Sequence, residues 1–376
     1  MPRGCRPLGI NLAAGLYFRQ ATLLGFILAG SVKRRKMQAG HTVIELFAGA
    51  GGLALGLEEA GLDTVLLVDI DKHACATLRK NRPQWNVVCD SVANVDWAPY
   101  AGKVDVVTGG FPCQAFSHAG KKLGFEDTRG TLFFEFARCV KEVRPKIFVG
   151  ENVEGLVRHD EGRTFKAMVA IMESFGYRVQ WKVLNAVEYG VPQKRKRVII
   201  VGTLPGIYFE YPEPQKRIVT LREALKDVPL SPGATYSEHR TEVLKLVPPG
   251  GSWIDLPIEL QKEYLGKSFY SGGGKRGMAR RIAWDEPCLT LTTSPSQKQT
   301  DRIHPEETRP FTIREYARIQ TFPDEWQFSG GVGAQYMQIG NAVPVRLAKA
   351  VGLQVVAALD GKNKQRSIVE PIAARV

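Results

Sequence analysis

Short apolar runs alternate with amphipathic stretches along the first half of the chain, between His41 and Thr203. Runs with the length and residue types of buried strands occupy 42–47, 64–69, 104–110, 146–152 and 198–203. Stretches of helix length separate these runs, which indicates βαβ units and a mostly parallel sheet. The pattern therefore predicts an α/β fold with helices on both faces of the sheet.

The pattern changes after Leu204. Prolines cluster between Pro205 and Pro257 and regular periodicity fades, which predicts a smaller, loop-rich unit. Helical periodicity returns at Thr312–Gln320 and at Val345–Leu359. The predicted organisation is a domain made of 41–204 and 332–360, a second domain at 205–331, and a basic tail at 361–376.

Residues 1–40 do not share this organisation. The apolar stretch Ala21–Gly30 is too short to span a bilayer, and the positive charges of Lys33–Lys36 follow it, whereas those of a signal peptide precede the apolar run. We expect an N-terminal extension, disordered or arising from an over-called start, with Met37 as the functional beginning. A loosely docked helix is the alternative.

Composition adds an argument from charge. The chain of 376 residues carries 51 Lys and Arg against 38 Asp and Glu, a formal net charge of +13. This excess favours a polyanionic partner, nucleic acid first, although a basic surface without such a partner is the alternative. The six cysteines include no C-x-x-C pair and the six histidines form no ligand motif, so neither a zinc site nor a disulfide framework is predicted. A reducing, cytoplasmic setting fits best.

The segment Thr108–Ser117 (TGGFPCQAFS) places Cys113 on a Gly- and Pro-constrained loop directly after a predicted strand. In an open α/β sheet, ligands bind at the carboxyl ends of the strands, so this thiol would face a cleft. Its thiolate form would be a strong nucleophile. A buried, inert cysteine is the alternative at this point.

The loop Phe47–Gly52 (FAGAGG) joins the first predicted strand to a helix-like segment. Its glycines allow backbone N–H groups and a helix N-terminus to approach a nucleotide-like ligand. Asp69 ends the next strand, where its carboxylate could accept hydrogen bonds from ribose hydroxyls, and Asp90 could reach an adenine amino group. The same glycines with Ala54 also satisfy the G-x-G-x-x-A pattern of dinucleotide enzymes, and a tight helix–strand turn would need them too. All three interpretations stay open on this loop alone.

Two further segments carry candidate chemistry. Glu151 closes an apolar strand, and a parallel sheet would bring it to the same edge as Cys113, as covalent catalysis requires. Strand alternation places Gln193, Arg195 and Arg197 on one face, where planar guanidinium groups suit phosphate and carbonyl oxygens. A capping or ion-paired glutamate and a solvated run of charges are the alternatives.

Six blocks occur in a characteristic order: FAGAGG, GGFPCQAFS, RGTLFF (129–134), ENV (151–153), QKRKRV (193–198), and the pair REYARIQTFPD (314–324) and QIGNAVP (338–344). With these blocks the chain resembles the bacterial DNA (cytosine-5)-methyltransferases over nearly all of Thr42 to Leu359. The combination is specific, whereas each block alone is not. The resemblance implies a Rossmann-like methyltransferase sheet, S-adenosylmethionine as cofactor, and double-stranded DNA as partner.

The resemblance also implies roles for matching positions. Cys113 would attack carbon 6 of cytosine and Glu151 would hydrogen-bond or protonate ring nitrogen 3. Arg197 would contact the base carbonyl and Arg195 a phosphate or a nearby loop. The cofactor-binding residues that it implies are Phe47, Ala48, Gly49, Gly51, Gly52, Asp69, Ile70, Asp90, Ser91, Pro112, Asn341 and Val343. The DNA-binding residues that it implies are Gln114, Ser117, Gln193 and Thr290.

Target recognition is expected in the domain 205–331. Its most basic stretch, Ser271–Arg281, adds Lys275, Arg276, Arg280 and Arg281 as expected DNA contacts, by default to phosphate. We expect a monomer with a restriction–modification role, no metal site and no membrane contact. The alternatives are a transfer RNA cytosine-5 methyltransferase and a catalytically silent DNA-binding relic, with a nicotinamide oxidoreductase the weakest.

Overall fold

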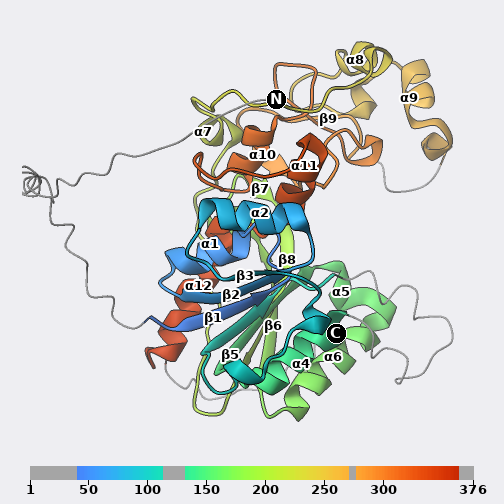
Figure 1. The fold of residues 1–376 in the computed structure, drawn as a ribbon. Coiled ribbons are helices and arrows are strands. Elements are labelled where there is room, and N and C mark those ends of the chain that lie inside the picture. Colours follow the sequence, from blue (N-terminus) through green and yellow to red (C-terminus); the bar gives the residue numbers. More distant parts are fainter. Residues whose placement is uncertain (1–39, 113–131, 271–276, 364–376) are drawn as a thin grey trace, which may run out of the picture. The chain divides into compact units, whose positions relative to one another are not determined.

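The computed structural model describes residues 40–112, 132–270 and 277–363. The strands of its main sheet are β1 (Thr42–Leu46), β2 (Asp63–Asp69), β3 (Val87–Cys89), β4 (Val106–Gly109), β5 (Ile147–Val153), β6 (Arg178–Asn185) and β8 (Lys196–Thr203). They lie in the order β3-β2-β1-β4-β5-β8-β6 (Figure 1). Only β8 runs opposite to the other strands of this sheet, so the mostly parallel sheet is confirmed.

The carboxyl ends of β1 and β4 lie in register with Gly150 of β5. Leu46 at the end of β1 lies opposite Gly109 of β4, which in turn lies opposite Gly150 of β5. Because these strands are parallel, the residues that come next, including Glu151 within β5, lie at one edge of the sheet. Phe47 and Glu151, which are separated widely in sequence, are therefore brought to the same side of the molecule.

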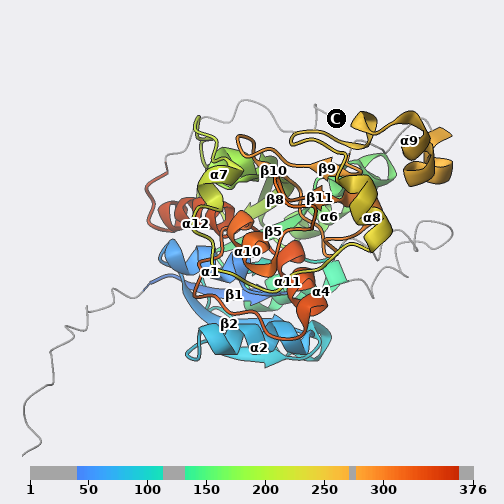
Figure 2. The same cartoon turned by 90° about the horizontal axis from the view of Figure 1, so that it is seen from above.

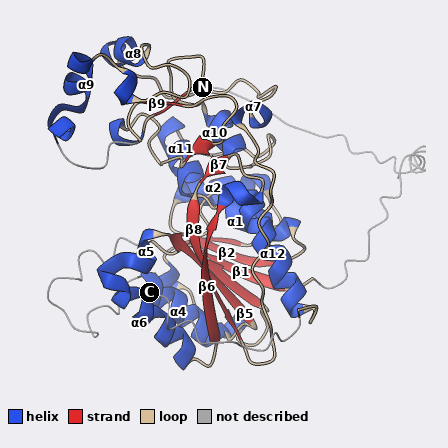
Figure 3. Cartoon of the chain, turned by 180° about the vertical axis from the view of Figure 1, so that it is seen from behind, coloured by secondary structure: helices blue, strands red, loops and turns tan. Residues whose placement is uncertain are grey.

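Helices cover both faces of the sheet (Figure 3). They are α1 (Gly52–Glu59), α2 (Lys72–Asn81), α4 (Leu132–Val143), α5 (Gly155–Arg158), α6 (Arg163–Ser174) and α12 (Val345–Leu359). Leu57 and Leu347, from α1 and α12, share a buried cluster with Val149 of β5. The preceding residue of β5, Phe148, faces the other cluster with Phe136 of α4. Alternate residues of one strand thus serve two cores, as a sheet covered on both faces requires.

The remaining elements are short and connected by long loops. They are β7 (Gln193–Lys194), α7 (Leu221–Ala224), α8 (Glu238–Leu244), α9 (Ile258–Leu265), β9 (Arg280–Arg281), β10 (Cys288–Leu289), β11 (Arg302–Ile303), α10 (Ile313–Ile319) and α11 (Val332–Asn341). Single turns of 3₁₀ helix lie at Val92–Asn94, Ala98–Tyr100, His159–Gly162, Ala186–Tyr189, Trp253–Asp255, Gly266–Tyr270 and Lys298–Thr300. The prediction that the chain after Leu204 is rich in loops is confirmed.

The short elements pack in two places. Leu244 and Met278 belong to a small separate core around α8 and α9. In contrast, Ile319 of α10 and Ile339 of α11 share a cluster with Ala54 of α1, and Figure 2 shows α10 next to α11. The exact domain boundaries, 204/205 and 331/332, stay predictions.

The elements that were not anticipated from the sequence include β6 and α11. In β6 only Leu184 is fully buried, so the strand shows no run of apolar residues. The buried residues of α11 include Gln338 and Gly340 beside Tyr336 and Ile339, and this mixture hides the helical periodicity. In both cases tertiary contacts support an element that local pattern alone does not indicate.

One stretch of the described residues, Val332–Leu359, is long and apolar enough to cross a membrane. It consists of α11 and α12, which the Ala342–Pro344 turn separates. Of its most apolar window, 56% is buried inside the protein. Both helices contribute to the buried clusters, so core packing accounts for the composition.

Gly56 allows α1 to contact α12 closely. A Cβ at this position would lie 2.4 Å from the Cβ of Ala348 and 2.5 Å from the carbonyl oxygen of Val345. We predict that Gly56→Ala lowers the free energy of unfolding by about 1–3 kcal/mol, because the helices must move apart. Urea denaturation followed by circular dichroism measures the change.

Gly333→Ala in α11 is the matched control. Nothing lies within 4 Å of a Cβ built there. Because alanine is the better helix former, this variant should be neutral or gain up to about 1 kcal/mol. Equal effects of the two substitutions would contradict the close packing of α1 on α12.

Candidate active site

A cavity of about 590 Å³ opens where β1, β4 and β5 end, and this volume is typical of small-molecule sites. Among the described residues, it gathers every predicted catalytic and cofactor-binding residue except Gly51. They are Phe47, Ala48, Gly49, Gly52, Asp69, Ile70, Asp90, Ser91, Pro112, Glu151, Arg195, Arg197, Asn341 and Val343. One cavity therefore unites residues from five separate sequence blocks.

Five of the predicted residues lie outside the described part of the chain: Cys113, Gln114, Ser117, Lys275 and Arg276. Cys113 is the residue bonded to Pro112, and Pro112 lines the cavity. The roles of all five stay predictions.

The FAGAGG loop turns into the cavity because three of its residues have positive φ: Phe47 at 58°, Gly49 at 54° and Gly51 at 83°. Asp69 fixes the loop. Its Oδ2 accepts a hydrogen bond from the Gly49 N–H at 2.7 Å, and its Oδ1 accepts one from the Asp71 N–H at 2.8 Å. Burial raises the pKa of Asp69, and these two N–H groups oppose that shift.

The same loop is wedged against the C-terminal segment. A Cβ on Gly52 would lie 2.2 Å from the carbonyl oxygen of Val343. A Cβ on Gly51 would lie 3.2 Å from the ring of Trp326, so Gly51 serves packing behind the cavity and does not line it. Gly52 is therefore needed for the loop and the Asn341–Val343 segment to form one wall.

Glu45 is buried at the cavity, with 2% of its surface exposed. Its Oε2 has no hydrogen-bond partner among the described residues, and neither has Oγ1 of Thr108, which lies opposite Glu45 in the pairing of β1 with β4. Burial raises the pKa of Glu45 well above its usual value, and the nearby Asp69 carboxylate acts in the same direction. A buried acceptor without a hydrogen-bond partner destabilises the folded protein. A hydrogen-bond donor or a positive charge of a ligand would therefore bind favourably here. Sequence analysis missed Glu45, although an acidic residue inside an apolar run was a usable signal.

Glu151 and Arg197 form an ion pair at the cavity. Arg197 Nε lies 2.7 Å from Glu151 Oε1, and the two side chains are 12% and 11% exposed. A second donor of Arg197, Nη1, binds the backbone carbonyl of Lys196 at 2.8 Å. The carboxylate is therefore held in one orientation beside the loop that leads to Cys113.

Asn152 is a positioning residue that sequence analysis missed. It is 4% exposed, and its Nδ2 donates to the carbonyl oxygen of Phe111 at 2.7 Å. The Phe111 ring packs against Phe133 and Phe136, with centroids 5.5 Å from each. Asn152 therefore fixes the last described residues before Cys113. Its position inside the ENV block was the available signal.

Gln193 and Arg195 are buried, 0% and 1% exposed, whereas the lysines beside them are exposed, as strand alternation predicts. Arg195 donates to the carbonyls of Leu291 at 3.0 Å and Gly340 at 2.8 Å. Arg195 was expected to contact a phosphate or a nearby loop, and the structure shows the contact with a loop. Gln193 was expected to contact DNA, but its amide group bonds Leu291 and Gln320 inside the protein. A packing role thus replaces the expected DNA contact.

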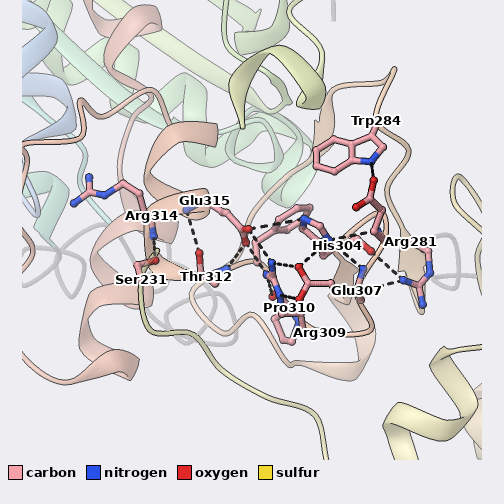
Figure 4. Close-up of polar contacts among 12 residues, drawn as sticks. Ser231, Arg281, Trp284, His304, Glu307, Arg309, Pro310, Thr312, Arg314 and Glu315 are labelled. Carbon is pink, nitrogen blue, oxygen red and sulfur yellow. Dashed lines mark hydrogen bonds and ion pairs between the residues drawn. The ribbon is translucent and has the colours of Figure 1, made fainter. Parts of the chain in front are cut away.

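Arg281 also departs from the expected phosphate contact. It is 3% exposed, and its guanidinium donates to the carbonyls of Val247 at 2.6 Å, Leu244 at 2.9 Å and His304 at 3.0 Å. Figure 4 shows its side chain directed toward the His304 and Glu307 segment. Burial lowers the pKa of Arg281. Its donors hold this unit together and do not face solvent.

Arg280 and Thr290 are bound but partly accessible. Arg280 makes a bidentate ion pair with Glu286 at 2.8 and 2.9 Å, and 17% of its side chain is exposed. Thr290 Oγ1 donates to the carbonyl of Lys194 at 2.8 Å. A DNA contact by either residue stays a prediction.

A wider cleft of about 920 Å³ lies beside α12 and contains none of the predicted site residues. Its Arg217, Arg318 and Lys349 each pair with an acidic residue. The part of the chain that the structure describes also holds no group of three or more His, Cys, Asp or Glu able to bind a metal ion. The cavity at the strand ends is therefore the candidate active site.

Comparisons with known proteins agree with this geometry. The family model for C-5 cytosine-specific DNA methylases matches residues 41–357. The chain is 61% identical to the Type II methyltransferase M.Eco47II of Escherichia coli, over 86% of this chain and 81% of that protein. It is 55% identical to M.Sau96I of Staphylococcus aureus, over 90% and 80%. The chain thus belongs to the C-5 cytosine-specific DNA methylase family and is a DNA (cytosine-5)-methyltransferase.

A solved structure extends the likeness in fold. The Entamoeba histolytica methyltransferase EhMeth superposes with a TM-score of 0.62 at 17% identity, covering 87% of this chain and all of that one. At this identity the likeness concerns the fold alone. The predicted α/β methyltransferase fold is confirmed.

We predict that Glu45→Gln stabilises the ligand-free protein at neutral pH. An acid whose pKa is raised by folding contributes its full stability below the unfolded value, near 4.5, and loses it as the pH rises through the folded pKa. Glutamine keeps the shape without the buried charge. In thermal unfolding from pH 4.5 to 8, the melting temperature of the wild type should fall progressively below that of the variant. A difference that stays constant with pH would contradict the assignment.

His304 gives a prediction of the opposite sign. Its Nδ1 accepts the backbone N–H groups of Glu306 at 3.3 Å and Glu307 at 3.2 Å. Burial lowers the pKa of His304 and Arg309 acts likewise, while Glu315 opposes them. The unfolded chain therefore takes up the proton first, and stability present above about pH 6.5 is lost as the pH falls toward the folded pKa. Between pH 7.5 and 5.5 the urea midpoint of the wild type should drop further than that of His304→Asn.

Proposed function

We propose that this methyltransferase transfers a methyl group from S-adenosylmethionine to carbon 5 of a flipped-out cytosine in a short duplex DNA site, through a covalent adduct of Cys113. The observation that carries the proposal is the Glu151–Arg197 ion pair, which lies at the same cavity as Pro112, the neighbour of Cys113. An acid/base group and the residue that precedes the proposed nucleophile thus lie at one cavity, beside a wall that contains glycines.

The cavity lining fits S-adenosylmethionine. Ile70 lines the cavity yet is 75% exposed, so it offers an apolar surface for an adenine ring together with Phe47. Asp69 would hold the ribose hydroxyls. Asp90 would hold the adenine amino group, and its Oδ1 is oriented by the Ser91 N–H at 2.6 Å. When bound, this cofactor supplies an electrophilic methyl group on a sulfonium.

The remaining lining residues complete that site. Glu45 presents the unpartnered acceptor that a cationic ligand needs. Asn341 and Val343 would close the cavity from the C-terminal segment, with Ala48, Gly49 and Gly52 on the opposite wall. Backbone N–H groups at the start of α1 add a favourable environment for polar ligand groups.

The chain's own side chains would activate the base. The Cys113 thiolate adds to carbon 6 of cytosine while Glu151, held by Arg197, stabilises a proton at ring nitrogen 3. The electron pair then resides at carbon 5, which becomes nucleophilic enough to accept a methyl group. A base removes the carbon 5 proton, the carbon–sulfur bond breaks, and the thiolate leaves. Because a stacked base is out of reach, extrusion of the cytosine precedes these steps.

The other properties follow from the class of protein. The net charge of +13 suits the DNA backbone, and recognition would involve the loop-rich part of the chain with Thr290, Arg280, Lys275 and Arg276. We further propose a cytoplasmic monomer that modifies DNA in a restriction–modification system, since the relatives carry the name Type II methyltransferase.

Bisulfite sequencing of DNA from a host that expresses the protein tests the activity and identifies the site together. We predict protected cytosines within one short sequence motif in the presence of the wild type. Cys113→Ser should bind duplex DNA but leave no protected cytosine. The absence of protection with the wild type would contradict the proposal, and protection of transfer RNA alone would favour the RNA alternative.

Glu151→Gln should lower the methyl transfer rate to DNA by about 10²–10⁴-fold, because the proton at nitrogen 3 loses its partner. The matched control is Glu154→Gln, on the same side of the sheet, which removes only an exposed pair with Lys196 at 3.5 Å. This control should keep the wild-type rate. Single-turnover transfer of labelled methyl groups measures both, and equal losses would contradict the role of Glu151.

A further inference from the structure

The segment 288–292 of the loop-rich part is hydrogen-bonded to β7, the short strand that precedes Arg195 and Arg197. Cys288 and Leu289 of β10 pair in parallel with Gln193 and Lys194 of β7. The pairing continues beyond the strands, because the N–H of Leu291 donates to Oε1 of Gln193 at 2.9 Å. Any displacement of 288–292 therefore acts on the buried side chain of Gln193.

A second buried amide continues this connection to the cofactor wall. Gln193 Nε2 donates to Oε1 of Gln320 at 2.8 Å, and Gln320 Nε2 donates to the carbonyls of Ile339 at 2.7 Å and Ala342 at 3.1 Å. Both glutamines are 0% exposed. The hydrogen bonds thus form a continuous chain. It starts at the N–H of Leu291, passes through the Gln193 and Gln320 amides, and ends at the segment that places Val343 at the cavity.

A parallel connection runs beside the two amides. Arg195 bridges the carbonyls of Leu291 and Gly340, at 3.0 and 2.8 Å. Gly340 also touches the same segment directly, since a Cβ on it would lie 2.5 Å from the carbonyl oxygen of Thr292. The segments 288–292 and 339–343 therefore share buried polar contacts through three side chains.

Buried hydrogen bonds of this kind resist gradual distortion. In a region closed to water, an amide that loses its partner cannot find a replacement, so the chain of bonds is either intact or broken at a distinct cost. A ligand that fixes one end then favours the intact arrangement at the other end. This is the physical requirement for coupling between two binding sites.

We propose that Gln193 and Gln320 are positioning residues that couple DNA binding near segment 288–292 to cofactor binding at segment 339–343. The inference rests on the proposed function, because it assigns the first segment to the DNA-binding side and the second to the S-adenosylmethionine site. Binding of either ligand strengthens binding of the other, and the two glutamines transmit the effect.

Hydrogen–deuterium exchange of the wild type tests the connection without any substitution. S-adenosylhomocysteine, which lacks the transferable methyl group, is added in the absence of DNA. The amide of Leu291, whose N–H bonds Gln193, should exchange more slowly on addition, together with the amides of 339–343. Protection of 339–343 without any change at Leu291 would overturn the inference.

Substitutions test the transmission. The dissociation constant of a duplex carrying the methylated site is measured with and without S-adenosylhomocysteine. For the wild type we expect about fivefold or stronger tightening by the cofactor product, within the usual range of coupling between sites. In Gln320→Met and Gln193→Met, which keep volume but lose the amide, the tightening should fall below about twofold.

Gln338→Met is the matched control. Gln338 is 5% exposed and equally hydrogen-bonded, but its partners are Thr77, Ser329 and Ala334, away from both segments. It should lose stability and keep the wild-type coupling. Loss of coupling in the control, or wild-type coupling in Gln320→Met, would overturn the inference. If neither DNA nor S-adenosylhomocysteine binds the wild type, the proposed function itself fails, whereas binding of each without mutual tightening contradicts only the coupling.

Discussion

The parallel register of β1, β4 and β5 is the constraint on which the rest of this molecule depends. Leu46, Gly109 and Gly150 lie side by side in the sheet. The glycine-rich loop, the residues that lead to Cys113 and the Glu151 side chain therefore lie at one edge. A slip of one residue in any pairing would turn alternate side chains to the other face. The apolar clusters on both faces make such a slip costly, and so the core fixes the site.

Charge is divided within the cavity according to burial. Its acidic side contains Glu45 and Asp69, whose pKa values are raised by burial, and it lacks a protein cation to neutralise them among the described residues. Its basic side contains Arg197, which is paired with Glu151, and Arg195, which donates hydrogen bonds to backbone carbonyls. A cationic cofactor on one side and a base with polar edges on the other would satisfy this division. The geometry thus agrees with the membership of the chain in the C-5 cytosine-specific DNA methylase family.

The sequence predicted the strands with clean apolar runs and the residues inside well-spaced motifs, since both depend on short-range order. It did not predict β6, whose residues are mostly half-buried, because an edge strand needs no continuous apolar run. It also could not show that Arg281 and Gln193 are enclosed, since a basic or polar residue reads as solvent-exposed until the carbonyls that accept its hydrogen bonds are known. Asn152 and Glu45 each had a sequence signal, but their roles depend on contacts across strands, which the signal does not give.

The central claim is that the Cys113 sulfur bonds carbon 6 of an extruded cytosine. Its most direct test is mass spectrometry of the protein after incubation with S-adenosylmethionine and a duplex in which 5-fluorocytosine replaces the target base. Fluorine at carbon 5 cannot leave as a proton, so the final elimination stops and the adduct accumulates. We expect a stable protein–DNA species whose peptide map places the nucleotide on Cys113. An adduct on another cysteine, such as the exposed Cys89, or rapid methylation of the normal duplex with no adduct on the fluorinated one, would contradict this account.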